Sequence, residues 1–257
     1  MSLQCGIVGL PNVGKSTLFN ALTVSTVPAE NYPFCTITPH IGNVELFDQR
    51  LYELGKIYRP KIIIPATVEF LDIAGLVRGS SRGEGLGNQF LGQIRQTQAI
   101  IQVVRCFEDY NIGHVDGNID PIRDVETIKS EFILRDLDTL EKQRSKKEKL
   151  SKSGDKVIIS ELEVLNKLIE HCNAGHRART FHANDNELVF FRSLQLLSGK
   201  PILYIANVND NEIMYDNKNK NVNVLFDLAK SEGNNAIRIC ATIEQEIALL
   251  QEKDKKP

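Results

Sequence analysis

A phosphate-binding loop lies close to the start of this chain. Residues 9–16 read Gly-Leu-Pro-Asn-Val-Gly-Lys-Ser, which satisfies the pattern G-x-x-x-x-G-K-[ST]. In such loops backbone N–H groups and a helix N-terminus bind phosphate, the lysine reaches the β- and γ-phosphates, and the following hydroxyl binds Mg²⁺. An apolar run at 5–9 and helical spacing of apolar side chains at 15–22 predict the strand and the helix that such a site requires. The residues expected to contact a nucleoside triphosphate are Asn12, Val13, Gly14, Lys15, Ser16 and Thr17, with Lys15 also catalytic.

A second group of residues would complete a magnesium site. Asp72 and Gly75 form a D-x-x-G pattern directly after an apolar run at 66–71, and open α/β sheets bind ligands at the carboxyl ends of their strands. Asp72 is expected to hold Mg²⁺ through water, and the N–H of Gly75 to contact the γ-phosphate. Thr36 lies in a proline-bounded loop, where switch NTPases place a Mg²⁺-binding threonine. The predicted cofactor is Mg²⁺, and its candidate ligands are Ser16, Thr36 and Asp72, with Thr38 as the alternative to Thr36.

The residue that should orient the attacking water differs from that of Ras-like enzymes. Leu76 follows the D-x-x-G pattern, where those enzymes carry a glutamine. Because a leucine side chain cannot hydrogen-bond to water, hydrolysis is expected either to be slow or to use another polar group. His114, in the loop at 109–115, is the candidate catalytic replacement, and the alternative is an ordinary exposed loop histidine.

A third group of residues is placed to bind the base of the nucleotide. Residues 207–210 read Asn-Val-Asn-Asp after an apolar run at 201–206, in the position of the N-K-x-D segment that recognises guanine in GTPases. The aspartate of that segment accepts hydrogen bonds from guanine N1–H and N2–H₂, which adenine lacks. Val208 replaces the lysine that packs over the base, so ATP and GTP both remain candidates. The residues expected at the base are Asn207, Val208, Asp210, Cys240 and Ala241, with Thr242 completing the pocket.

Composition limits the class of protein. The chain has 257 residues and a formal net charge of −2, which suits one large α/β domain or a domain with an insertion and gives no general attraction for polyanions. Its five cysteines include no C-x-x-C pair, and this favours reduced thiols in the cytosol over disulfides. The sequence shows no signal-peptide pattern and no apolar run of bilayer-spanning length. We therefore expect a cytoplasmic protein with no membrane partner and no sequence-specific DNA partner.

Strands and helices alternate along the chain. Apolar runs at 99–106, 201–206 and 236–240 are typical of buried parallel strands, and a helix is expected before each of the last two. This alternation predicts an α/β fold of the P-loop NTPase type with a doubly wound, mostly parallel sheet. The interval from Asp72 to Asn207 is far longer than two strand–helix units require, which indicates an insertion.

The predicted insertion at 120–198 has the pattern of a helical coiled-coil hairpin. Apolar residues at helical spacing flank a turn at 151–155 and form one expected seam. They are Ile128, Phe132, Leu134, Leu137 and Leu140 before the turn, and Ile158, Leu162, Leu165, Leu168 and Ile169 after it. The nucleotide-binding domain would then comprise 1–119 and 199–257. A basic cluster near the turn is either a solvated helix tip or a contact for nucleic acid or the ribosome, and it consists of Arg144, Lys146, Lys147, Lys149 and Lys152.

With these motifs in place, the chain resembles the Obg-like ATPase (YchF) family of P-loop proteins over nearly its whole length. The most specific segments are 9–17, 31–39 (NYPFCTITP), 65–79 (PATVEFLDIAGLVRG), 83–88 (GEGLGN), 104–111 (VRCFEDYN), 114–115, 120–121 and 204–210. The resemblance implies a GTPase-like domain interrupted by a coiled-coil domain, Mg²⁺-dependent ATP hydrolysis, ribosome association and a regulatory or stress-related role. It also implies that Leu76 is the family's hydrophobic substitution for glutamine and that His114 takes part in catalysis. Members of the family usually carry a C-terminal TGS domain, which we expect to be absent here.

Three functions are consistent with these observations. The leading hypothesis is an ATP-hydrolysing switch that associates with the ribosome or a ribosomal subunit. Asp210 stands where the family commonly has glutamate, and this keeps a GTPase of the same fold as the first alternative. The second alternative is a nucleotide-gated ribosome-binding module whose turnover is incidental.

Overall fold

A six-stranded sheet forms the centre of the computed structural model, which describes residues 2–23, 41–73, 92–109, 113, 117–213 and 219–250. Its strands are β1 (Leu3–Val8), β2 (Ile41–Glu45), β3 (Thr67–Asp72), β4 (Ala99–Arg105), β5 (Ile202–Asn207) and β6 (Asn235–Ile239). Their order is β2-β3-β1-β4-β5-β6, and every neighbouring pair is parallel except β2 with β3. The predicted α/β class with a mostly parallel sheet is confirmed.

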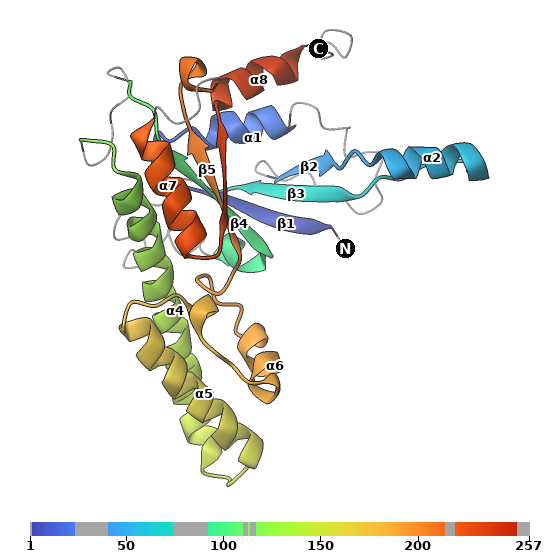
Figure 1. Ribbon diagram of the computed structural model, residues 1–257. Helices are drawn as coiled ribbons and strands as arrows, with labels where there is room; N and C mark the ends of the chain where they lie inside the picture. The colour runs from blue at the N-terminus through green and yellow to red at the C-terminus, as the bar shows by residue number, and fades with distance from the viewer. Residues whose placement is uncertain are drawn as a thin grey trace.

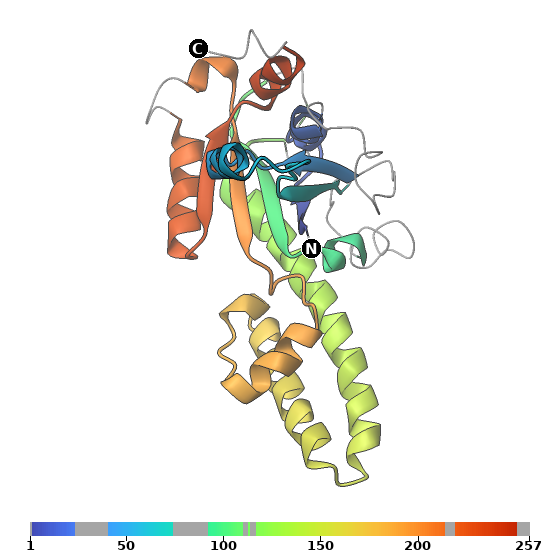
Figure 2. The same ribbon diagram turned by 90° about the vertical axis from the view of Figure 1, so that its right-hand side faces the viewer.

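Helices cover both faces of the sheet. On one side α1 (Lys15–Thr23) packs against α8 (Ala241–Leu249), and on the other side lies α7 (Lys220–Ser231) (Figure 2). The core between these layers contains Ile7, Ile100 and Tyr204, which are fully buried. Because all strands except β2 run parallel, their carboxyl ends form one shared edge, and that edge carries the loops of the candidate site.

The segment between β2 and β3 contains a helix that the sequence patterns did not predict. α2 (Gln49–Tyr58) begins after Asp48, whose carboxylate accepts a hydrogen bond from the N–H of Arg50 at 2.9 Å, and none of its residues is buried. Apolar periodicity reveals a helix when one face packs on a core, and α2 projects from the body at the end of the β2–β3 pair (Figure 1). The antiparallel direction of β2 also had no signal in the local sequence.

The predicted insertion contains a long antiparallel pair of helices that points away from the sheet (Figures 1 and 2). α4 (Pro121–Ser151) starts after Asp120, whose side chain accepts a hydrogen bond from the N–H of Arg123 at 3.1 Å. α5 (Lys156–Asn173) returns along it, and α6 (Asp185–Ser193) contacts α5. No helix within the described ranges, α4 included, is both long enough and apolar enough to span a membrane. The domain boundaries at 119/120 and 198/199 stay a prediction.

Two apolar clusters divide the length of α4. In its first half, Ile128 and Phe132 belong to the apolar cluster that contains the sheet residues. In its second half, Leu140 belongs to a separate cluster with residues of α5. The expected single seam is therefore wrong for Ile128 and Phe132, and also for Leu134, which is 40% exposed. Successive helical residues are turned by about 100°, so the residues next to Leu134 on the helix, rather than Leu134 itself, form the buried stripe.

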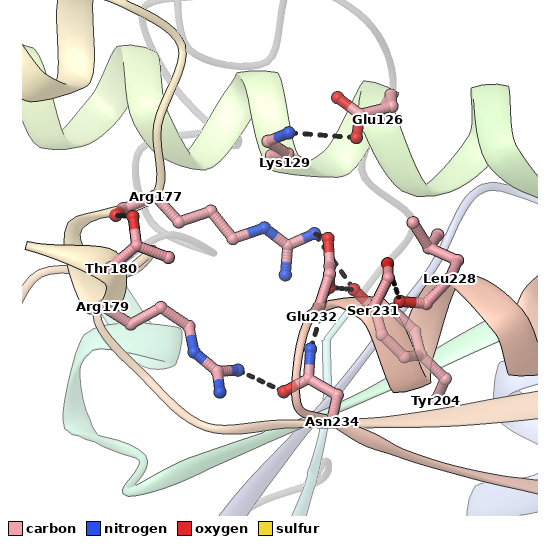
Figure 3. A network of polar contacts seen from close by, with 10 residues as sticks. All are labelled: Glu126, Lys129, Arg177, Arg179, Thr180, Tyr204, Leu228, Ser231, Glu232 and Asn234. Carbon is pink, nitrogen blue, oxygen red and sulfur yellow. Dashed lines mark hydrogen bonds and ion pairs between the residues drawn. The ribbon is translucent and has the colours of Figure 1, made fainter.

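A polar network fixes the end of the insertion to the nucleotide-binding part of the chain (Figure 3). The Nη2 atom of Arg177 donates to the hydroxyl of Tyr204 at 3.0 Å and lies 3.3 Å from Oε1 of Glu232. The Tyr204 hydroxyl donates in turn to Oε2 of Glu232 at 2.7 Å. Beside this group, Arg179 donates to the side chain of Asn234. These contacts tie the segment that follows α5 to β5 and to the end of α7.

Candidate functional site

The phosphate loop occupies the turn between β1 and α1, as the sequence predicted. Gly14 has a φ of +95°, and a Cβ at this position would overlap the side-chain amide of Asn207. A Cβ at Gly9 would lie 2.6 Å from the carbonyl oxygen of Val103 on β4. Both glycines therefore allow the loop to approach the neighbouring strands closely, and Gly14 also supplies a backbone conformation that other residues avoid. The loop leads directly into α1, whose first residue is Lys15.

Lys15 is a buried cation at the centre of the loop. Its side chain donates to the carbonyl oxygen of Leu10 at 2.8 Å, and the residue is 7% exposed. Burial lowers the pKa of the Lys15 ammonium, and the nearby carboxylate of Asp72 partly opposes this shift. An ammonium group held in this way is stabilised when phosphate oxygens approach it, because they supply the negative charge that water no longer supplies.

Ser16 and Asp72 meet at the position expected for a divalent cation. The hydroxyl of Ser16, in the first turn of α1, lies 3.3 Å from Oδ2 of Asp72 and donates to it. Asp72 ends β3 next to β1, and its Oδ1 atom is buried with no hydrogen-bond partner among the described residues. A buried carboxylate oxygen without a donor, close to a hydroxyl oxygen, fits the oxygen ligands that Mg²⁺ prefers. The third candidate ligand, Thr36, lies outside the described residues, as does Thr38.

The base end of the site is a cavity of about 500 Å³ at the carboxyl edge of the sheet. Of the residues predicted to bind nucleotide, the cavity is lined by Asn12, Gly14, Thr17, Asn207, Val208, Asp210, Cys240, Ala241 and Thr242. Asn209, between Val208 and Asp210, lines it as well and was not predicted as a contact. Four more lining residues were not predicted as contacts: Phe107, Asp109, Ile243 and Glu246. Phe107 and Asp109 follow β4 at the same edge as the other loops. Their position after a predicted strand could have identified them as site residues. The other two lie within α8, on the side facing the cavity.

Asn207 connects three parts of the site. Its Nδ2 atom donates to the carbonyl oxygen of Val13 at 2.9 Å, and its Oδ1 atom accepts from the N–H of Ala241 at 3.0 Å. The residue is 4% exposed, so these bonds are protected from water. The end of β5 is thereby joined to the phosphate loop and to the start of α8.

The two residues expected beside Asn207 have different environments. Val208 is buried, and its N–H donates to the carbonyl oxygen of Ile239, which continues the pairing of β5 with β6. Asp210 is exposed at the mouth of the cavity, and its Oδ1 accepts from the N–H of Asn211 at 2.7 Å. One carboxylate oxygen thus has a bond within the loop. The roles assigned to both residues at the base remain predictions.

Several predicted site residues cannot be placed. Gly75, Leu76 and His114 lie outside the described residues, so the contact to the γ-phosphate and the replacement for glutamine stay predictions. Close to His114 in sequence, the carbonyl of Gly113 accepts a hydrogen bond from Nδ2 of Asn12 at 3.1 Å. Within the described ranges no group of three or more histidine, cysteine or acidic side chains could form a separate metal centre.

A mostly parallel sheet, a G-x-x-x-x-G-K-S loop between β1 and α1, and an acidic residue at the end of β3 define a P-loop nucleoside triphosphatase. A family model described as 50S ribosome-binding GTPase matches residues 4–207. The chain belongs to the YchF family, because it is 48% identical over its whole length to the ribosome-binding ATPase YchF of Bacillus subtilis and covers 70% of that protein.

Two further relatives support the same assignment. The ribosome-binding ATPase YchF of Escherichia coli O157:H7 is 46% identical over 99% of this chain, which covers 69% of that protein. The solved structure of the Schizosaccharomyces pombe YchF GTPase superposes with a TM-score of 0.83 at 33% identity, and the alignment covers 99% of this chain and 69% of that one. The resemblance seen in the sequence motifs is confirmed.

Proposed function

We propose that this protein binds ATP with Mg²⁺, hydrolyses it slowly, and uses the nucleotide to control an association with the ribosome in the cytoplasm. The observation that carries the nucleotide half of the proposal is the arrangement of Lys15, Ser16 and Asp72 around the phosphate loop. The ribosome half rests on the family, whose curated bacterial members are called ribosome-binding ATPases.

The residues of the loop have separate tasks in this proposal. The ammonium of Lys15 and the N-terminus of α1 stabilise the charge of the β- and γ-phosphates. Ser16 and Asp72, with Thr36, would hold Mg²⁺, which when bound neutralises the charge that develops on the transferred phosphoryl group. His114 would orient the attacking water, because Leu76 offers it no hydrogen bond.

The base pocket favours ATP without excluding GTP. Val208 replaces the lysine of the guanine-recognition segment, and its side chain is buried. Asp210 favours guanine, since its exposed carboxylate could accept hydrogen bonds from N1–H and N2–H₂. A GTPase of the same fold is therefore the alternative substrate assignment.

Titration calorimetry with ATP and with GTP, each with Mg²⁺, tests the substrate. Binding of ATP at least tenfold tighter, equal to about 1.4 kcal/mol, is the expected result, and tighter binding of GTP would reassign the protein to the GTPases. Lys15→Ala is expected to abolish phosphate release, with Lys56→Ala on the exposed surface of α2 as the control. Full phosphate release by Lys15→Ala would refute the proposed enzyme.

A second candidate function is a nucleotide-gated ribosome-binding module with incidental turnover. The observation that favours it is the α4–α5 hairpin, which extends from the nucleotide-binding part and carries the basic cluster near its turn (Figure 1). This candidate predicts that His114→Ala keeps ribosome co-sedimentation intact. Loss of co-sedimentation with unchanged nucleotide affinity would count against it.

A further inference from the structure

Arg105 is a buried cation at the end of β4 that bonds to two of the next four residues of the chain. The residue is 2% exposed. Its Nε atom donates to the carbonyl oxygen of Phe107 at 3.2 Å, and its Nη2 atom donates to the carbonyl oxygen of Asp109 at 3.1 Å. Its guanidinium carbon also lies 4.5 Å from the centre of the Phe107 ring. Burial of a guanidinium is unfavourable unless its donors are bonded, so these contacts link the charge of Arg105 to one conformation of the following segment.

The other two carbonyl groups of that segment are also held by side chains. Nδ2 of Asn219, at the start of α7, donates to the carbonyl oxygen of Cys106 at 2.8 Å. Nδ2 of Asn209, after β5, donates to the carbonyl oxygen of Glu108 at 3.1 Å. All four successive carbonyl groups of residues 106–109 therefore accept a hydrogen bond from a side chain. We call these four residues the strap.

The strap forms one wall of the base end of the nucleotide cavity. Phe107 and Asp109 line that cavity together with residues that follow β5 and β6, including Asp210 and Ala241. The lining also includes Asn12, Gly14 and Thr17 of the phosphate loop, but neither Lys15 nor Asp72, the residues assigned to the β- and γ-phosphates and to Mg²⁺. A change confined to the strap should therefore alter contacts to the base and ribose and leave contacts to the phosphates intact.

We propose that Arg105 is a positioning residue of the nucleotide site: by bonding two carbonyls of the strap and stacking on Phe107, it presents the strap to the base and ribose without touching the nucleotide. The proposal rests on the function proposed above. Arginine suits this role because its planar guanidinium group donates hydrogen bonds in fixed directions, whereas the lysine ammonium lies at the end of a flexible alkyl chain. A wall held in its bound conformation before the ligand arrives avoids the cost of ordering it on binding.

Arg105→Lys tests the proposal, because it keeps the positive charge and removes the planar guanidinium group. We expect the KM for Mg-ATP to rise roughly tenfold, as the loss of charged hydrogen bonds implies, with kcat within about twofold. The inhibition constant of Mg-tripolyphosphate, which competes for the phosphate loop and has no base, should stay unchanged. Arg177→Lys is the matched control, since Arg177 is an equally buried arginine, 5% exposed, that contacts no residue of the strap.

A second variant covers the case in which Arg105→Lys does not fold. Asn219→Ser keeps a side-chain oxygen that can cap α7 through the N–H groups of Asn221 and Val222. It removes the amide that donates to Cys106 and to Glu212, and it places no second carboxylate beside Glu212. It should raise the KM for Mg-ATP in the same direction, by a smaller factor, with the tripolyphosphate constant unchanged.

Each outcome decides between the proposals. An unchanged KM for Mg-ATP in Arg105→Lys, or in Asn219→Ser if the first variant is unfolded, overturns the positioning role. A parallel loss of kcat, ATP affinity and tripolyphosphate affinity also overturns it, because it indicates a general structural defect. If the wild-type protein does not hydrolyse ATP, the proposed function fails, and calorimetric ATP binding by the same variants still tests Arg105.

Discussion

At the scale of single residues, the site is built on charges that are held without full compensation. Lys15 has lost most of its water and is bonded to one carbonyl, and Asp72 has one buried oxygen with no partner among the described residues. Each group is less stable in the free protein than it would be beside an ion of opposite charge. A bound triphosphate and its metal ion supply both missing charges. The free-energy cost of burying Lys15 and Asp72 in the free protein therefore favours nucleotide binding.

The shifted pKa of Lys15 predicts a pH-dependent affinity. Burial lowers the pKa of this ammonium below the ordinary lysine value of 10.5, and a bound triphosphate should raise it again. Protons are therefore taken up on binding at alkaline pH, and ATP affinity falls as the pH rises through the pKa of the free protein toward 10.5. Calorimetry in two buffers of different ionisation enthalpy measures this uptake. Lys15→Arg should lose the dependence, and proton release in the wild type would contradict it.

Gly14→Ala tests the backbone of the phosphate loop. The φ of +95° and the overlap with the amide of Asn207 predict a loss of ~1–2 kcal/mol in unfolding free energy from the backbone conformation alone, together with weaker ATP binding. Gly154→Ala is the control, because Gly154 has a φ of +77° with open space around it, far from the site. Denaturant unfolding and calorimetry should show lower stability in both variants and weaker binding only in Gly14→Ala. Normal ATP binding by Gly14→Ala would refute the close approach to Asn207.

At the scale of elements, the sequence predicted what local patterns encode. β1, β4 and β5 are mostly apolar because most of their residues are buried in the sheet, and such runs are visible in the sequence. α2 was missed because no face of it is buried, and the direction of β2 was missed because pairing depends on β3, more than twenty residues away. The positions of Ile128 and Phe132 on the sheet cluster depend likewise on packing partners distant in sequence.

The candidate site shows the same limit. The phosphate loop was recognised because its residues are contiguous and their spacing is set by the chemistry of phosphate. The wall formed by Phe107 and Asp109 was not, because it depends on bonds from Arg105, Asn209 and Asn219. The bonds of Asn207 to residues of the phosphate loop and α8 join segments that only the folded sheet brings together.

The junction between the insertion and α7 should be strongly stabilising. Glu232 accepts from Tyr204 and from Asn234 and pairs with Arg177, whose side chain is 6% exposed. Glu232→Gln leaves that buried guanidinium without a carboxylate and should lower the unfolding free energy by roughly 3 kcal/mol. Glu53→Gln is the control, because the Glu53–Lys56 pair on α2 is exposed and should contribute less than ~1 kcal/mol. Equal losses in denaturant unfolding would show that the junction is weak.

At the scale of the whole molecule, α4 is a rigid connection between the two clusters. Its 31 residues correspond to about 46 Å of helix. Because one half packs on the sheet and the other half packs on α5, the hairpin cannot turn freely about its base. The same sheet carries the nucleotide site on its carboxyl edge. A partner that binds the hairpin therefore meets a surface whose orientation is fixed relative to that site.

The basic cluster at the tip of the hairpin is either a solvated helix end or a surface that binds a partner, and substitutions can distinguish the two. Two of its five basic residues already contact carboxylates, since Lys147 pairs with Glu161 and Arg144 with Glu148. The other three, Lys146, Lys149 and Lys152, are exposed. If they meet the phosphates of ribosomal RNA, replacing all three with glutamate should weaken ribosome co-sedimentation and flatten its dependence on salt, because fewer counterions are released.

The control for this prediction changes the net charge by the same amount elsewhere. Lys56, Lys61 and Lys230 are exposed on the nucleotide-binding part, and their replacement by glutamate leaves the tip intact. Loss of co-sedimentation in the tip variant alone, with unchanged ATP turnover, assigns the contact to the hairpin. Equal losses in both variants indicate a general effect of net charge, and no loss in the tip variant shows that its lysines only keep the helix end in water.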